Sequence, residues 1–222
     1  MSTLLTINVT NLGASTQEFY FFQQPAVYSG GSAVYSNSLY SQSLGNYQET
    51  GAQLTFQVNM QYYAGIQQAH RTPTIGQTSG YASASRAIDL TPATGSANSA
   101  TMASIDPLGL SQPSAGVNVQ PGAFRITTPT YLSPPSIYNV GSAVEVNGGI
   151  TLSNFVVANP SSHTDCQPIL KYYVQTGKYT AGTVMNFTQS SVNSAICDFT
   201  GGYSIINASL NADGSWSTQV VK

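Results

Sequence analysis

Charged side chains are scarce in this sequence. Lysine, arginine, aspartate and glutamate make up 6% of its 222 residues, whereas about 25% is usual in a soluble domain. The six cations stand singly along the chain, so they form no basic patch of the kind that displaces counterions from phosphates. The composition therefore indicates that nucleic acid is not a partner.

Long apolar runs are also missing. No run of about eighteen consecutive apolar residues occurs, which is the length that a membrane-spanning helix needs. The opening residues, Met1 to Val9, alternate polar with apolar and carry no basic segment, which is typical of a strand and not of a signal peptide. We expect no membrane span, and a chain that is cytoplasmic, exported without a classical leader, or a mature form.

Cysteine and histidine are rare, with two of each. A disulfide between Cys166 and Cys197 would close a loop of about thirty residues and add about 3 kcal/mol on the loop-entropy model. Two buried free thiols fit the sequence equally well, so both alternatives stay open. The spacing of these residues around His163 and Asp165 matches no zinc motif, so we predict no metal site.

The short motifs of catalysis are absent as well. The chain has no Gly-x-Ser-x-Gly turn, no phosphate-binding Gly-Lys loop and no dinucleotide fingerprint. Its carboxylates show no spacing that indicates a glycosidase pair. We therefore expect no cofactor, and the sequence favours a protein that is not an enzyme.

Neutral hydrogen-bonding residues are abundant instead. Serine, threonine, asparagine and glutamine supply more than a third of the chain, and the net charge is only −2. A surface of hydroxyls and amides repels its own copies weakly, because little like charge is present to keep them apart. Self-association into a homo-oligomer is therefore favoured.

Period-two alternation is the main structural signal, because successive side chains of a strand point to opposite faces. It is clearest from Gln53 to Met60, and the Asp213-Gly214 pair predicts a tight hairpin. The other predicted strands are 5–10, 18–23, 124–127, 143–146, 150–157, 169–174, 183–188, 203–210 and 215–221.

The middle of the chain, residues 71–121, loses this alternation and is rich in Thr, Ser, Ala, Gly and Pro. It is either a region of long ordered loops, which we favour, or a set of irregular edge strands. Ser83 to Leu90 is the one place where a short helix fits. The sequence predicts an all-β chain: one antiparallel β-sandwich over residues 1–222, jelly-roll or Ig-like Greek key in type, with long loops in the middle.

Tyrosine is the residue best suited to recognition, and there are 14. It offers a rigid aromatic face and a hydroxyl, which suits contact with sugars or with another protein. We take Tyr62, Tyr63 and Tyr172 as candidate ligand-binding residues. The alternative is that these tyrosines only build strands, with one ring of each Tyr-Tyr pair facing inward.

Three functions follow in order of preference. The first is a structural or interaction protein that associates with itself through a neutral Tyr/Ser/Asn/Gln-rich surface. The second is a lectin-like carbohydrate-binding module. The third is a small-molecule-binding protein or enzyme with a site in the 71–121 loops, where His70, Arg71 and Arg86 are the first candidates, because isolated cations suit an anionic ligand.

Overall fold

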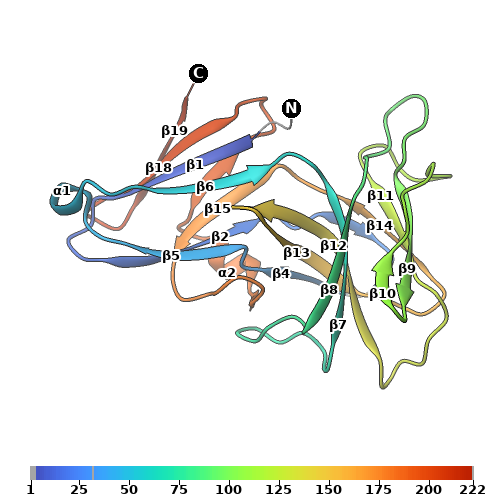
Figure 1. The fold of residues 1–222 in the computed structure, drawn as a ribbon. Helices are drawn as coiled ribbons and strands as arrows, with labels where there is room; N and C mark the ends of the chain where they lie inside the picture. Colours follow the sequence, from blue (N-terminus) through green and yellow to red (C-terminus); the bar gives the residue numbers. More distant parts are fainter. Residues whose placement is uncertain (1–3, 32, 222) are drawn as a thin grey trace.

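The protein is described here by a computed structural model that covers residues 4–31 and 33–221 (Figure 1). Their regular secondary structure is almost entirely β-strand, arranged in three sheets, so the all-β prediction is confirmed. The largest sheet has ten strands: β1 (Leu4–Asn11), β4 (Val34–Asn37), β6 (Leu54–Asn59), β7 (Tyr63–Ala69), β8 (Ala82–Ala87), β12 (Ile137–Val146), β13 (Gly149–Val157), β16 (Val184–Met185), β18 (Ile205–Leu210) and β19 (Trp216–Val221).

Two smaller sheets and two short helices complete the described chain. The five-stranded sheet contains β3 (Val27–Ser29), β9 (Ala100–Ile105), β10 (Leu108–Leu110), β11 (Phe124–Thr127) and β14 (His163–Gln167). The four-stranded sheet contains β2 (Gln17–Gln23), β5 (Tyr40–Leu44), β15 (Lys171–Thr176) and β17 (Ala195–Asp198). The helices are α1 (Tyr47–Thr50) and α2 (Phe187–Ser191), and no described helix is long and apolar enough to cross a bilayer.

The main path of the ten-stranded sheet runs β16-β4-β13-β12-β6-β1-β18-β19, and β7 and β8 branch from β12. Neighbours in this sheet are antiparallel, with one exception: β1 lies parallel to β18, with Thr6 opposite Ile205. The strands near the two ends of the chain therefore lie side by side, and β19 forms one margin of the sheet (Figure 1).

The two largest hydrophobic cores of the described residues lie against the ten-stranded sheet. One joins β1, β6 and β18 to β2, β15 and β17 of the four-stranded sheet. The other joins β7, β12 and β13 to β9, β11 and β14 of the five-stranded sheet. Strand β12 supplies Val144 to the first core and Val140 to the second, with a register shift at Ser142/Ala143 between them. The bulge thus lets one strand serve both cores.

The aromatic run in β2 is covered on both faces. Phe19 and Phe21 belong to the core shared with the large sheet, whereas Tyr20 and Phe22 pack with Tyr173 on the opposite face. Phe21 stacks on Phe56 of β6 with ring centroids 4.2 Å apart. Burial of these rings supplies much of the hydrophobic stabilisation at the centre of this half of the molecule.

Three predicted elements differ from the structure. Ser83 to Leu90 is not a helix: β8 occupies its first part, because pairing with β7 outweighs the low strand preference of Ala and Ser. The predicted strand 183–188 is reduced to β16, because Asn186 caps α2 through a hydrogen bond from the backbone N–H of Gln189. The middle segment contains β8, β9 and β10 joined by loops; β8 and β10 are edge strands, as the alternative expects, whereas β9 lies between β10 and β11.

Candidate functional site

The three candidate tyrosines do not form a common binding surface. Tyr172 is buried in the core beneath the large sheet, where desolvation raises its pKa. Tyr62 is half-buried against the second core. Tyr63 donates a hydrogen bond from its hydroxyl to the Glu145 carboxylate at 2.8 Å, and its pKa is raised to about 12, first by desolvation and then by that carboxylate. The strand-building alternative therefore accounts for these rings.

His70 and Arg71 do lie together, at the end of β7. The exposed His70 ring stacks on Tyr81, with ring centroids 3.9 Å apart and an interplanar angle of 10°. His70 and Tyr81 line a surface cavity of about 260 Å³, together with Arg71, Thr78 and Ser79. The Arg71 guanidinium donates to the Gln77 side chain at 3.1 Å and is otherwise exposed. The lining of this cavity thus includes one cation, one imidazole and one tyrosine.

Arg86 is not part of that cavity. It lies on β8, and its guanidinium donates to the backbone carbonyl of Leu110 on β10 at 3.1 Å. The hydrogen bond joins the ten-stranded sheet to the five-stranded sheet. Arg86 therefore has a structural partner, and the structure does not bring it together with His70 and Arg71.

The two cysteines are free thiols in separate cores, so the disulfide alternative is wrong. Cys166 lies on β14 in the core of the five-stranded sheet, and Cys197 lies on β17 in the core of the four-stranded sheet. Burial raises the pKa of each thiol to about 12. Each sulfur therefore behaves as a small apolar core group.

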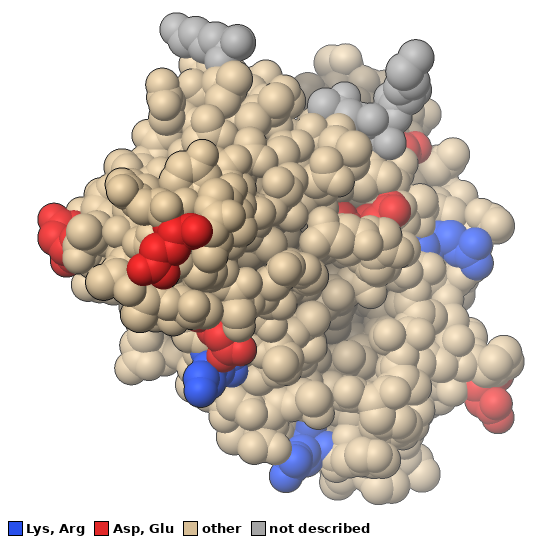
Figure 2. All heavy atoms as spheres, turned by 60° about the vertical axis from the view of Figure 1, so that its left-hand side comes forward, with Lys and Arg blue, Asp and Glu red and all other residues tan. Residues whose placement is uncertain are grey.

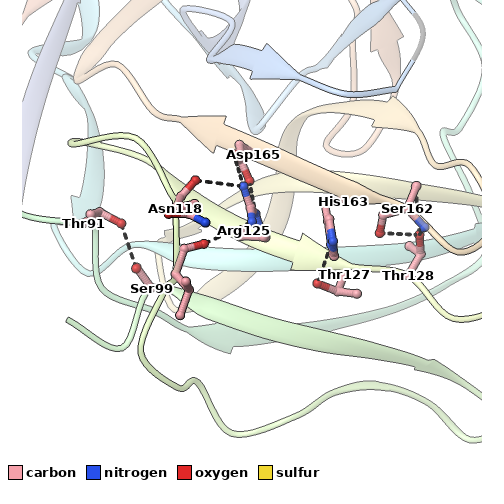
Figure 3. A network of polar contacts seen from close by, with 10 residues as sticks. Thr91, Ser99, Asn118, Arg125, Thr127, Thr128, Ser162, His163 and Asp165 are labelled. Carbon is pink, nitrogen blue, oxygen red and sulfur yellow. Dashed lines mark hydrogen bonds and ion pairs between the residues drawn. The ribbon is translucent and has the colours of Figure 1, made fainter. Parts of the chain in front are cut away.

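The second histidine belongs to a polar network on β11 and β14 (Figure 3). His163 Nδ1 lies 3.0 Å from the Thr127 hydroxyl, its register partner on the adjacent strand. Asp165 binds Arg125 with both carboxylate oxygens, at 2.6 and 2.8 Å. Because Arg125 occupies the Asp165 carboxylate, that group does not orient His163, and a Ser-His-Asp arrangement is not assembled here.

Charges are few and isolated over the visible surface. Figure 2 shows acidic and basic side chains as scattered spots on a surface made of uncharged residues. In residues 4–31 and 33–221, no three His, Cys, Asp or Glu side chains gather where they could hold a metal ion. Two ion pairs are formed in that part of the chain, Arg125–Asp165 and Lys171–Asp198.

The outer face of β6, β1, β18 and β19 carries no charged side chain at all. We call it the neutral face. One cross-strand row contains Thr55, Asn8, Asn207 and Gln219, which are successive register partners. Within this row, the Thr55 hydroxyl donates to Asn8 Oδ1 at 3.1 Å, and Asn8 Nδ2 donates to Asn207 Oδ1 at 3.0 Å. The row is a ladder of amides and hydroxyls.

The neutral face ends at β19, whose outer margin pairs with no strand in the described chain. In the hairpin that leads into it, the Asn211 N–H donates to the Ser215 carbonyl at 2.8 Å. Bonded and non-bonded pairs alternate along antiparallel strands. The peptide groups of Ser217, Gln219 and Val221 therefore face β18, and those of Trp216, Thr218 and Val220 face outward.

A second hydrogen bond supports this assignment. The Leu12 N–H donates to the Leu210 carbonyl at 2.8 Å, so the peptide of Leu210 faces β1 and not its register partner Trp216. Strand β19 thus presents free donors and acceptors along a margin six residues long. The segment has no Pro and no charged residue, two of the devices that block edge pairing.

Comparisons of this chain with protein-family models, with curated proteins and with solved structures found no match. The candidate surfaces are therefore assigned from their own geometry. Sequence reasoning missed Tyr81 as the partner of His70, and it missed the open margin of β19. A strand was predicted at that place, but its position at the margin depends on the parallel pairing of β1 with β18, which has no local sequence signal.

Proposed function

We propose that this chain is a non-enzymatic structural or interaction protein that associates with copies of itself. The observation that carries the proposal is the neutral face together with the unpaired margin of β19. Approach of two such surfaces meets little electrostatic repulsion, because β6, β1, β18 and β19 lack charged side chains. The free peptide groups of the margin gain hydrogen bonds when another strand adds to it. We also propose that the facing sheets are best classed as a β-sandwich.

Sedimentation equilibrium over a concentration series tests the proposal. We expect the average mass to rise from one chain toward a multiple of it, and to do so equally at low and high sodium chloride. Salt has little effect because screening acts on charges, which this surface lacks. A single-chain mass at every concentration would refute self-association, and association that disappears in high salt would assign it to the few charged residues instead.

The cavity at His70 supports a second candidate function, the binding of a small anionic ligand. Arg71 and the imidazole of His70 are the cationic and hydrogen-bonding groups that line it, and a guanidinium suits a carboxylate or phosphate. Calorimetric titration with inorganic phosphate and with citrate tests this candidate. Binding that disappears in Arg71→Gln but persists in Arg86→Gln would support it, and no heat of binding would exclude both anions.

The carbohydrate-binding alternative has less support. Sugars are bound by stacking on exposed aromatic faces, whereas Tyr172 is buried and Tyr62 and Tyr63 are only half-exposed. The exposed side of the Tyr81 ring is limited by its stack on His70. A glycan array without binding above background would remove this alternative.

A further inference from the structure

We propose that two copies of this chain pair through β19, antiparallel to each other, about a two-fold axis that passes beside Thr218. This inference rests on the proposed self-association and names the surface that carries it. The partner is a second copy because the outward-facing peptide groups of β19 are complementary to the same groups of another β19. The ten-stranded sheets of the two copies then form one continuous sheet across the axis.

The hydrogen bonds of the margin determine the register. Only Trp216, Thr218 and Val220 direct their N–H and C=O groups outward, so each of them must face one of the same three residues in the partner. Centring on Thr218 places Trp216 opposite Val220 and Thr218 opposite itself, and every outward group is bonded. If the partner strand is shifted by two positions, one of these three residues no longer lies opposite any of the three in the partner, and its peptide groups stay unbonded.

Side chains agree with that register on both faces. A two-fold axis perpendicular to the sheet keeps the inner faces on one side. Trp216 and Val220, both half-buried and packed against the first core, would then lie next to each other across the axis and lose further apolar area to the contact. On the outer face, Gln219 meets the partner's Ser217, so the ladder of neutral side chains continues.

Electrostatics do not oppose this dimer. The nearest carboxylate on the β18–β19 hairpin is Asp213, in the turn. In the proposed register the two copies of Asp213 lie ten positions apart along the strands, which is about 33 Å at ~3.3 Å per residue. That separation exceeds the screening length at physiological salt, about 8 Å.

The other sheet margins of the described chain are less suitable. Strand β16 has two residues, and β3 and β10 have three each. Strand β17 contains Asp198, which is paired with Lys171, and β8 is tied to β10 by Arg86. Strand β5 is uncharged and five residues long. Its residue Ser43, however, pairs with the exposed Glu18 of β2, which places a carboxylate beside this margin. Strand β19 is the longest uncharged margin among them.

Matched charge substitutions test the proposal. Thr218→Lys places two ammonium groups at the axis, and Ser43→Lys makes the same change on the β5 margin. Both positions are exposed. We expect Thr218→Lys to raise the dissociation constant measured by sedimentation about tenfold or more, and Ser43→Lys to leave it unchanged. Loss of association in Ser43→Lys alone, or no change in Thr218→Lys, would overturn the β19 interface while self-association itself stands.

A cross-linking experiment tests the register without weakening the contact. Residues opposite each other in a bonded antiparallel pair have Cα atoms about 5.5 Å apart, within the range of about 4.4–6.8 Å that a disulfide spans. Mild oxidation should convert Thr218→Cys to a covalent dimer and leave Gln219→Cys, its matched control, mostly single-chain. The native thiols are buried and do not compete. Equal or faster cross-linking of Gln219→Cys would overturn the register. A wild type that sediments as a single chain at every concentration would refute the proposed function itself.

Discussion

At the scale of single residues, the scarce charges of this chain hold neighbouring strands together. Arg125 on β11 and Asp165 on β14 are direct register partners, and so are Lys171 on β15 and Asp198 on β17. Arg125 also donates to the carbonyls of Val117 and Asn118, which ties a loop to the pair. The ion pairs therefore contribute to local register and leave most of the surface neutral.

Removing the charge of Asp165 should destabilise the fold. Its side chain is 13% exposed and accepts two hydrogen bonds from Arg125, so Asp165→Asn leaves a half-buried guanidinium without its counter-charge. We expect the free energy of unfolding in urea to fall by about 1–3 kcal/mol. Asp89→Asn is the matched control, since Asp89 is exposed, and it should change stability by less than about 0.5 kcal/mol. Equal effects of the two substitutions would contradict this role.

The Asp198 carboxylate should give a small pH-dependent contribution to stability. Hydrogen bonds from Thr200, and then the charge of Lys171, lower its pKa to about 2, against about 3.9 in an unfolded chain. A lowered pKa stabilises the folded state above about pH 4, and that contribution disappears as the pH falls toward 2. Because the side chain is 40% exposed, we expect at most about 1 kcal/mol. The stability difference between wild type and Asp198→Asn, measured from pH 7 to pH 2, should decrease as the pH falls below about 4; a difference that is constant with pH would contradict this.

Both native thiols should be unreactive until the protein unfolds. Burial raises the pKa of Cys166 and Cys197 to about 12, so at pH 8 almost no thiolate is present in the folded state, and the thiolate is the reactive form. A thiol-reactive chromophore added without reductant should label almost none of the folded protein and two thiols per chain in guanidinium. No labelling after unfolding would show a disulfide instead.

At the scale of elements, the strands that alternate in sequence are those that were predicted. Leu54, Phe56 and Val58 face the core from β6, as their spacing indicates. Strands such as β8 and β9 were missed because Ala and Ser carry little apolar contrast between the two faces. Their pairing with β7 and β11 supplies the order that the local sequence lacks.

The turn before β19 should be sensitive at Gly214. This residue has φ +83°, and a Cβ built there meets nothing within 4 Å. The cost of Gly214→Ala is therefore conformational, and we expect about 1 kcal/mol less stability in thermal or urea unfolding. Gly214→Asn should cost less, because Asn tolerates positive φ. Equal losses in both variants would indicate that the turn conformation is not the cause.

At the scale of the whole molecule, the sequence indicates the chemistry of the surface but not the place where it acts. The small number of charges predicts a mostly neutral exterior, and on the face drawn in Figure 2 the charged side chains are few and scattered. The sequence also suggested Tyr172 as a ligand contact, but both faces of β15 are covered and the ring is buried. Which strand ends the sheet follows from long-range pairing, chiefly that of Thr6 with Ile205. Such pairings between distant residues cannot be read from one sequence.

The most direct test of the account is amide hydrogen exchange in β19, measured residue by residue by NMR at low and high protein concentration. The N–H groups of Ser217, Gln219 and Val221 face β18 and should be protected at both concentrations. Those of Trp216, Thr218 and Val220 should exchange freely in dilute protein and become protected as concentration rises. Pairing through β19 would be contradicted if the protein associates but the exchange rates of these three amides do not change with concentration. It would also be contradicted if the protected amides of β19 do not alternate in this way.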